Sequence, residues 1–158
     1  KGLLMIQVQK EEFDVALEMK KLVGGHTSIG AIVTFVGLVR DMNSGVPILD
    51  LTLEHYPGMT QKMLQFIELE ACARWPLCGS LIIHRYGELA LGDMIVLVIT
   101  TSAHRQAAFE ANEFVVDWLK TKAPFWKRET TPKGKIWVSE RTSDFDSMTR
   151  WTDRRNSD

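Results

Sequence analysis

Cysteine is scarce in this 158-residue chain, which contains only Cys72 and Cys78. Their spacing fits no common zinc pattern, and two cysteines in a chain of this length make no disulfide framework. We therefore expect free thiols in or near the core of a protein that stays in a reducing compartment, the cytoplasm. The longest apolar runs, such as residues 94–99, have the length of a strand and are too short to span a bilayer. The first twelve residues become polar too soon for a secretory signal, so we expect no contact with a membrane.

The motifs of several enzyme classes are also missing. The sequence contains no Gly-x-Gly-x-x-Gly and no Gly-x-x-x-x-Gly-Lys, so the common nucleotide-binding folds lose their main support. It has no nucleophile elbow for serine hydrolase chemistry and no evident pair of carboxylates. His55 and His84 lie on predicted strands without a third ligand at a recognisable spacing. We expect neither a bound metal nor a cofactor.

The chain as a whole carries no excess of basic charge, but one segment does. Lysine and arginine total 19 against 20 acidic residues, a formal net charge of −1, which argues against a general nucleic-acid coat. Residues 118–135 differ, because they hold six cationic side chains and a single acidic one, a local charge of about +5. These are Lys120, Lys122, Lys127, Arg128, Lys133, Lys135 and the acidic Glu129. The segment therefore indicates a local site for an anion.

The hydrophobic pattern predicts three helices between short strands. Helical spacing of apolar residues indicates helices over 11–22, over 60–75 and from about 103 to a point before Pro124. Apolar, β-branched and aromatic runs predict strands over 3–8, 30–39, 48–55, 80–86, 94–101, 125–131 and 135–138. Helices separated by hairpin-like strand pairs favour an α+β domain over a doubly wound parallel sheet. We expect one domain over residues 1–151 and a flexible tail at 152–158.

Local signals add detail to this outline. Gly37, inside the second strand, suggests a β-bulge or a close approach of backbones. Residues 40–45 have turn chemistry and predict an exposed loop. Thr101 or Ser102 is expected to cap the third helix by accepting a hydrogen bond from its first turn.

Two lysines are the strongest candidates for chemistry. Lys120 and Lys127 are seven residues apart across a turn marked by Pro124. Lysine serves enzymes as a nucleophile or as a proton donor. The same positions also suit lysines that cap a helix end and lie on a solvated strand, and the pattern alone does not separate these interpretations.

Other candidates point to an anion. His104 and Arg105 lie at the positive end of the third helix's dipole, where an anion is favoured, and His104 is also a candidate for proton transfer. Arg40, at the end of a predicted buried strand, suits an anion anchor. Together these residues predict a basic pocket for a phosphate or a carboxylate, built from the strand ending at Arg40, the helix start at His104 and the turn to Lys127.

Six stretches, taken in order, resemble one known family. They are residues 30–40 (Gly-Ala-Ile-Val-Thr-Phe-Val-Gly-Leu-Val-Arg), 53–59, 74–77, 84–89, 102–105 (Ser-Ala-His-Arg) and 119–129. Ser-Ala-His-Arg followed by Lys-x-x-x-Pro-x-Trp-Lys is specific as a combination. Over roughly residues 30–151 the chain resembles the large, catalytic subunit of molybdopterin synthase.

The resemblance implies a fold, partners and a reaction. The fold would be an α/β-hammerhead, and the assembly a homodimer that carries one small ubiquitin-like sulfur-carrier subunit on each large subunit. The carrier's C-terminal Gly-Gly tail, as a thiocarboxylate, would enter the pocket and give sulfur to cyclic pyranopterin monophosphate. Two such transfers would make the dithiolene of molybdopterin. Donor and substrate are both anionic, which agrees with the basic pocket.

The resemblance also implies roles for individual residues. Lys120 matches the essential lysine of the family and Lys127 its second catalytic lysine. The substrate-binding positions would be Arg40, His104, Arg105, Phe35 as an apolar wall, and Arg141, which would reach the pocket across the dimer. The chain departs from the family at Met42, where many members have histidine, and at Val116, where a methionine is known; both concern the shape of the pocket.

Two other functions fit the same residues. One is a non-catalytic module that docks a ubiquitin-like partner through the basic patch. The other is a small RNA- or nucleotide-binding domain that uses the patch together with Trp118, Phe125 and Trp126. The near-neutral charge of the rest of the chain counts against the second.

Overall fold

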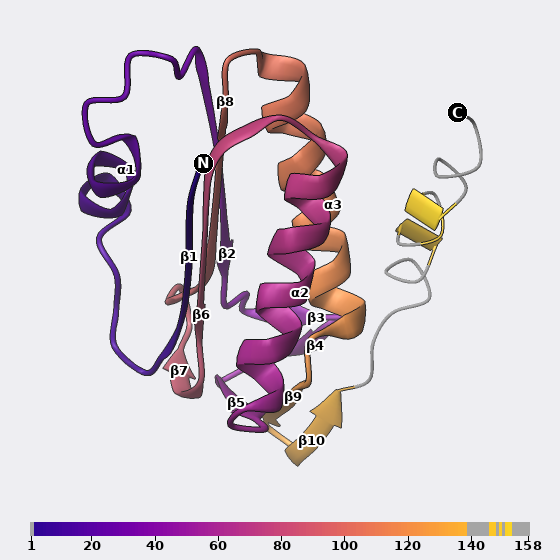
Figure 1. Ribbon diagram of the computed structural model, residues 1–158. Helices are drawn as coiled ribbons and strands as arrows, with labels where there is room; N and C mark the ends of the chain where they lie inside the picture. The colour runs from indigo at the N-terminus through magenta and orange to yellow at the C-terminus, as the bar shows by residue number, and fades with distance from the viewer. Residues whose placement is uncertain (1, 139–145, 148, 150, 153–158) are drawn as a thin grey trace.

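The computed structural model describes residues 2–138, 146, 147, 149, 151 and 152 (Figure 1). Its helices are α1 (Val15–Val23), α2 (Met59–Arg74) and α3 (Arg105–Lys122). Its strands are β1 (Leu3–Gln9), β2 (Ala31–Leu38), β3 (Met42–Asn43), β4 (Val46–Pro47), β5 (Asp50–His55), β6 (Leu77–Arg85), β7 (Gly87–Ala90), β8 (Met94–Ser102), β9 (Phe125–Thr131) and β10 (Gly134–Val138). The expected division into a domain over 1–151 and a tail at 152–158 stays a prediction, because residues 153–158 lie outside the described part.

A four-stranded sheet in the order β1-β6-β8-β2 forms the centre of the molecule. β8 runs antiparallel to both β6 and β2, and β1 runs parallel to β6. Helices α2 and α3 cover one face of the sheet and α1 covers the other (Figure 1). Because side chains alternate along a strand, Ile82 packs with the α2 and α3 side, whereas Leu81 and Ile83 pack with the α1 side.

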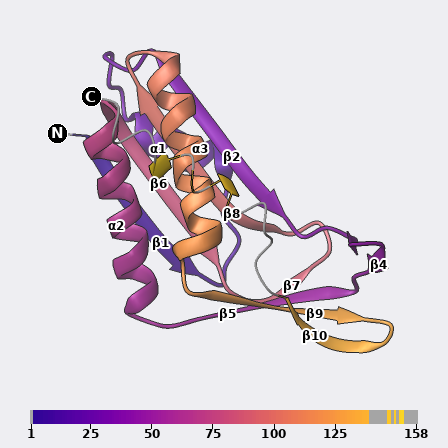
Figure 2. The ribbon, with the colours of Figure 1, turned by 90° about the vertical axis from the view of Figure 1, so that its right-hand side faces the viewer.

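A second sheet, in the order β10-β9-β5-β7, and the β3–β4 hairpin lie at one end of the central sheet (Figure 2). All of its strand pairs are antiparallel. Leu51 and Leu53 of β5 pack with Val39 and Leu89 in a small core of their own. The α+β class, the mostly antiparallel pairing and the three main helices predicted from the sequence are confirmed.

The glycine predicted to distort β2 does so. The register between β2 and β8 shifts between Gly37 and Leu38. A Cβ atom placed on Gly37 would lie 2.7 Å from Cγ1 of Val96, so any larger residue would clash with the neighbouring strand. The irregularity lies where β2 meets the second sheet, next to Arg40.

Two predicted connections contain strands instead. The prediction of an exposed loop at 40–45 misses β3 at Met42–Asn43, which forms a hairpin with β4, whereas Ser44 and Gly45 form the expected turn. Both turn residues have positive φ, 49° and 79°, as a two-residue hairpin turn of type I′ requires. Residues 87–93, which separate two of the predicted strands, contain β7, which pairs with β5. Strands this short carry no periodic signal, so only their partners reveal them.

The third helix begins later than predicted. Thr101 and Ser102 belong to β8, and their hydroxyls donate to the backbone oxygens of Gly79 and Pro76, at 3.2 and 2.8 Å. The predicted cap is therefore wrong; His104 occupies the N-cap position. The helix ends at Lys122, two residues before Pro124, as predicted.

Trp151 is buried against the helical layer. It is 1% exposed, its ring packs edge-on against Trp75 and Phe114, and its Nε1–H donates to Asp117 at 2.7 Å. Arg74 donates to its backbone oxygen. Trp151 thus belongs to the same packed core as α2 and α3. Among the described residues, no helix has the length and apolar character needed to span a membrane.

Candidate active site

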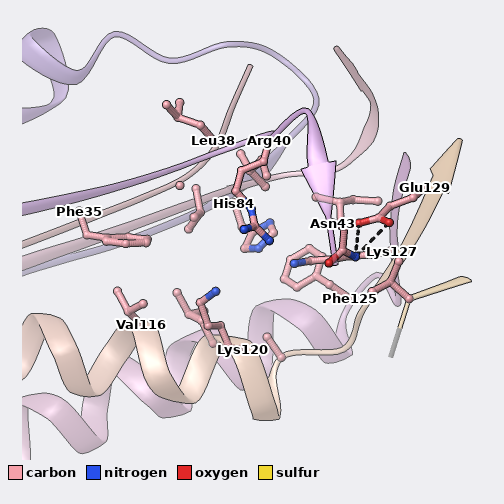
Figure 3. Close-up of a pocket in the computed structure, with 17 residues that line it drawn as sticks. Phe35, Leu38, Arg40, Asn43, His84, Val116, Lys120, Phe125, Lys127 and Glu129 are labelled. Carbon is pink, nitrogen blue, oxygen red and sulfur yellow. Dashed lines mark hydrogen bonds between the residues drawn. The ribbon is translucent and has the colours of Figure 1, made fainter. Parts of the chain in front are cut away.

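A cavity of about 450 Å³ opens where the second sheet meets the central one (Figure 3). Its walls come from both sheets, the β3–β4 hairpin and α3. The lining includes Phe35, Gly37 and Leu38 of β2 with the following Arg40; Asn43 of β3; Leu53 of β5; His84 of β6; Ile95 and Val96 of β8; Val116, Leu119 and Lys120 of α3; Phe125, Lys127 and Glu129 of β9; and Val138 of β10. The cavity therefore joins Phe35, Arg40, Lys120 and Lys127, as the sequence predicts.

Helix α3 directs Lys120 into this cavity. Its buried residues Val115, Trp118 and Leu119 pack on the central sheet and fix how the helix is rotated. Val116 and Lys120 are four residues apart and so lie on one face, which lines the cavity. Val116, one of the two departures from the family pattern, thus lies next to Lys120 on the cavity wall, whereas Met42 is 44% exposed on β3.

Strand β9 supplies the facing charges. Lys127 and Glu129 are two residues apart, so both side chains lie on the cavity side, while Arg128 points the other way and lies over the ring of Trp137. Asn43 donates two hydrogen bonds to Glu129, at 2.9 and 3.1 Å. These bonds tie the β3–β4 hairpin to β9 beside the cavity.

His84 is a site residue that sequence reasoning missed. We considered it only as a metal ligand, yet it lines the cavity with its ring stacked on Phe125, centroids 3.6 Å apart and planes at 15°. Burial lowers the pKa of His84 to about 4, helped by the charge of Lys127. The available signal was its place in the stretch 84–89, which carries part of the family resemblance.

The charged groups of the cavity favour an anion with an apolar part. Among the described lining residues, three cations, Arg40, Lys120 and Lys127, outnumber one carboxylate, Glu129. Cations that converge in a partly enclosed space attract phosphates and carboxylates. Phe35 and the neighbouring apolar side chains leave room for a ring next to the charges. In Figure 3 the amine of Lys120 approaches from α3, and Arg40 and Lys127 approach from the other walls.

The structure does not bring His104 and Arg105 to this cavity. They lie at the start of α3, and Lys120 lies fifteen residues further along the same helix, a distance of about 22 Å at 1.5 Å per residue. Neither residue lines the cavity. Within one chain the cavity therefore forms without the helix start at His104, and the role of both residues in substrate binding stays a prediction. Arg141 lies outside the described residues.

The remaining titratable groups show no further cluster. Within the described ranges, no three His, Cys, Asp or Glu side chains are grouped so that they could hold a metal ion. Cys72 and Cys78 are free thiols, as expected. His55 accepts or donates a hydrogen bond at Thr60, and burial lowers its pKa.

Comparison with known proteins agrees with the fold and the site. The MoaE protein family matches residues 8–122. The molybdopterin synthase catalytic subunit of Vibrio cholerae is 53% identical over 146 residues, which cover 92% of this chain and 97% of that protein. The corresponding Escherichia coli protein is 58% identical over 122 residues, or 77% of this chain and 81% of that one. The solved structure of molybdopterin cofactor biosynthesis protein E from Burkholderia multivorans superposes with a TM-score of 0.80 at 46% identity, covering 95% of this chain and 97% of that chain. The chain therefore belongs to the MoaE protein family.

Proposed function

We propose that this chain is the catalytic subunit of a molybdopterin synthase. As a sulfurtransferase it takes sulfur from the C-terminal thiocarboxylate of a small ubiquitin-like carrier and gives it to cyclic pyranopterin monophosphate. The observation that carries the proposal is the convergence of Arg40, Lys120 and Lys127 on one cavity with an apolar wall. The name of the relatives, catalytic subunit, supports at least one further subunit. The cytoplasm suits a protein with two free thiols.

The cavity meets the demands of this reaction. Sulfur donor and sulfur acceptor are both anions, and two anions approach each other only where cations offset their repulsion. Lys120 on α3 and Lys127 on β9 place such charges on different walls, and Arg40 offers a planar fork of donors that suits a phosphate. In this proposal both lysines stabilise the negative charge of donor and acceptor while sulfur is transferred between them.

A homodimer gives His104 and Arg105 a place in the same chemistry. Both residues lie about one helix length from the cavity of their own chain. In a dimer with two-fold symmetry, the helix start of one copy can reach the cavity of the other, and the same contact is then made twice. We therefore assign His104 and Arg105 to the cavity of a second copy, where they add cations for the substrate's phosphate.

The burial of the aromatic residues weighs against the nucleic-acid alternative. Trp118 is only 2% exposed, and one face of Phe125 is covered by His84. Two of the three aromatic rings proposed to stack on bases are thus occupied within the chain, and a single-strand site needs exposed rings in succession.

The test is single-turnover sulfur transfer from thiocarboxylated carrier to cyclic pyranopterin monophosphate. Lys120→Ala should abolish product while the variant still binds the carrier. Lys122→Ala is the matched control: it removes a cation from the same helix end, but Lys122 lies over the ring of Trp118 and does not line the cavity. Its turnover should stay near that of the wild type. A wild-type protein that binds carrier and never makes product would favour the non-catalytic docking module instead.

A further inference from the structure

The hydrogen bond made by His84 determines which of its ring nitrogens carries the proton. Nδ1 lies 2.9 Å from the backbone oxygen of Arg85. A carbonyl oxygen can only accept, so Nδ1 must donate and the neutral ring has its proton there. Nε2 then holds a lone pair. Within the part of the chain that the structure describes, Nε2 has no hydrogen-bond partner.

The ring is also held in place. His84 lies on β6 between β1 and β8, and its face is stacked on Phe125 of β9. Phe125 in turn pairs with His55 across β5 and β9. Strands of both sheets therefore fix the direction of the lone pair, and Figure 3 shows His84 beside Arg40 and Phe125 in the middle of the cavity.

The charge state of His84 contrasts with that of its neighbours. With its pKa lowered to about 4, chiefly by burial, the imidazole is neutral at physiological pH. Arg40, Lys120 and Lys127 can only donate hydrogen bonds. Among the described residues of the cavity wall, the other side-chain acceptors are Glu129, which accepts from Nδ2 of Asn43, and Oδ1 of Asn43, which lies 3.5 Å from the hydroxyl of Ser44. His84 thus offers an uncharged, rigid acceptor among donors.

We propose that His84 is a substrate-binding residue that determines specificity, whose Nε2 accepts a hydrogen bond from an N–H of the substrate's nitrogen heterocycle while the cations hold its phosphate. The inference rests on the proposed function and says which wall recognises which part of the substrate. A pterin ring carries N–H donors, and an acceptor aimed into a cavity binds most tightly a ligand that brings one. The phosphate alone provides tight binding of any phosphorylated compound; the acceptor selects the ring.

Two ligands separate these contributions. Cyclic pyranopterin monophosphate is titrated into the assembled synthase, and inorganic phosphate, which meets only the cations, is measured as an inhibitor of sulfur transfer. His84→Phe keeps a flat ring on Phe125 and removes the acceptor. It should weaken binding of the pterin about 3- to 10-fold, the loss expected for one hydrogen bond, and leave inhibition by phosphate unchanged. His84→Gln, which retains an acceptor, should lose less of the affinity for the pterin. Arg40→Ala should weaken both ligands.

Nitrogen NMR of His84 in the wild-type synthase tests the same contact without a substitution. Nε2 should give the signal of an unprotonated nitrogen that moves on addition of the pterin, whereas Nδ1 should stay protonated and phosphate should move neither. The proposal is overturned if Nε2 is protonated or if its NMR signal does not move on addition of the pterin. It is also overturned if His84→Phe binds the pterin as tightly as the wild type, or if this variant loses affinity for the pterin and for phosphate equally. Failure of the proposed function is a different result, namely no sulfur transfer by the wild type.

Discussion

The sharing of one site between two copies can be tested by mixing inactive variants. Lys120→Ala removes a charge from the cavity, and Arg105→Ala removes one from the start of α3. Each variant alone should be strongly impaired in sulfur transfer. A mixture of the two should regain activity, because a mixed dimer can combine an intact Lys120 from one copy with an intact Arg105 from the other.

The expected recovery follows from the separation within α3. About 22 Å between Arg105 and Lys120 places the two residues at opposite ends of one helix, so each copy contributes its Arg105 to the other's cavity. Random reassortment of equal amounts makes about half of all dimers mixed. Each mixed dimer has one site with both residues and one site with neither. The mixture should therefore show about a quarter of the wild-type activity.

The assay is single-turnover formation of molybdopterin after the two variants are co-expressed or reassembled, with mixed dimers counted by native mass spectrometry. A mixture of Lys120→Ala with Lys127→Ala is the control. Both lysines line the cavity of the same chain, so every site in that mixed dimer lacks one of them and no activity should return. The assignment to a second copy is refuted if mixed dimers form but Arg105→Ala does not complement Lys120→Ala. Full activity of Arg105→Ala alone would refute it as well.

Three further predictions concern stability. Neutral His84 has a folded-state pKa of about 4 against 6.5 in the unfolded chain, so the stability it contributes is present above pH 6.5 and is lost as the pH falls toward 4. His84→Phe should reduce the loss of unfolding free energy between pH 6.5 and pH 4, measured by urea denaturation, by at most ~3 kcal/mol. An unchanged pH dependence would contradict the burial of the ring. Burial raises the pKa of Glu68, so its ionised form costs stability as the pH rises through that pKa. Glu68→Gln should therefore gain stability over the wild type at pH 8 and lose this advantage by pH 4; a gain independent of pH would point to packing instead. Trp151→Ala removes a buried ring from Trp75 and Phe114 and should lower the free energy of unfolding by about 3–5 kcal/mol in chemical denaturation, whereas a loss below about 1 kcal/mol would contradict the burial of Trp151 in the core.

Local features of the chain, such as the end of a helix or the face of a strand, could be predicted from the sequence alone. Pro124 stops α3 at Lys122, and alternation along 125–131 puts Lys127 and Glu129 on one side of a strand. Gly37 marks the bulge because a glycine inside a strand pattern favours an irregular pairing. These features depend on neighbours within a few residues, so the pattern of residue types suffices to predict them.

The tertiary structure alone decided which of these pieces meet. Arg40 follows β2, His84 lies on β6 and Lys120 lies on α3. They lie around one cavity because β8 pairs with both β2 and β6, and α3 packs on β2 and β8. The sequence shows His84 only as a residue on a strand. Its role as an oriented acceptor depends on the stacking of Phe125 on its ring. Arg105, which the sequence grouped with the lysines, is separated from them by the rigid length of α3. Such outcomes depend on contacts between residues far apart in the chain, and these are set by how whole elements pack against one another.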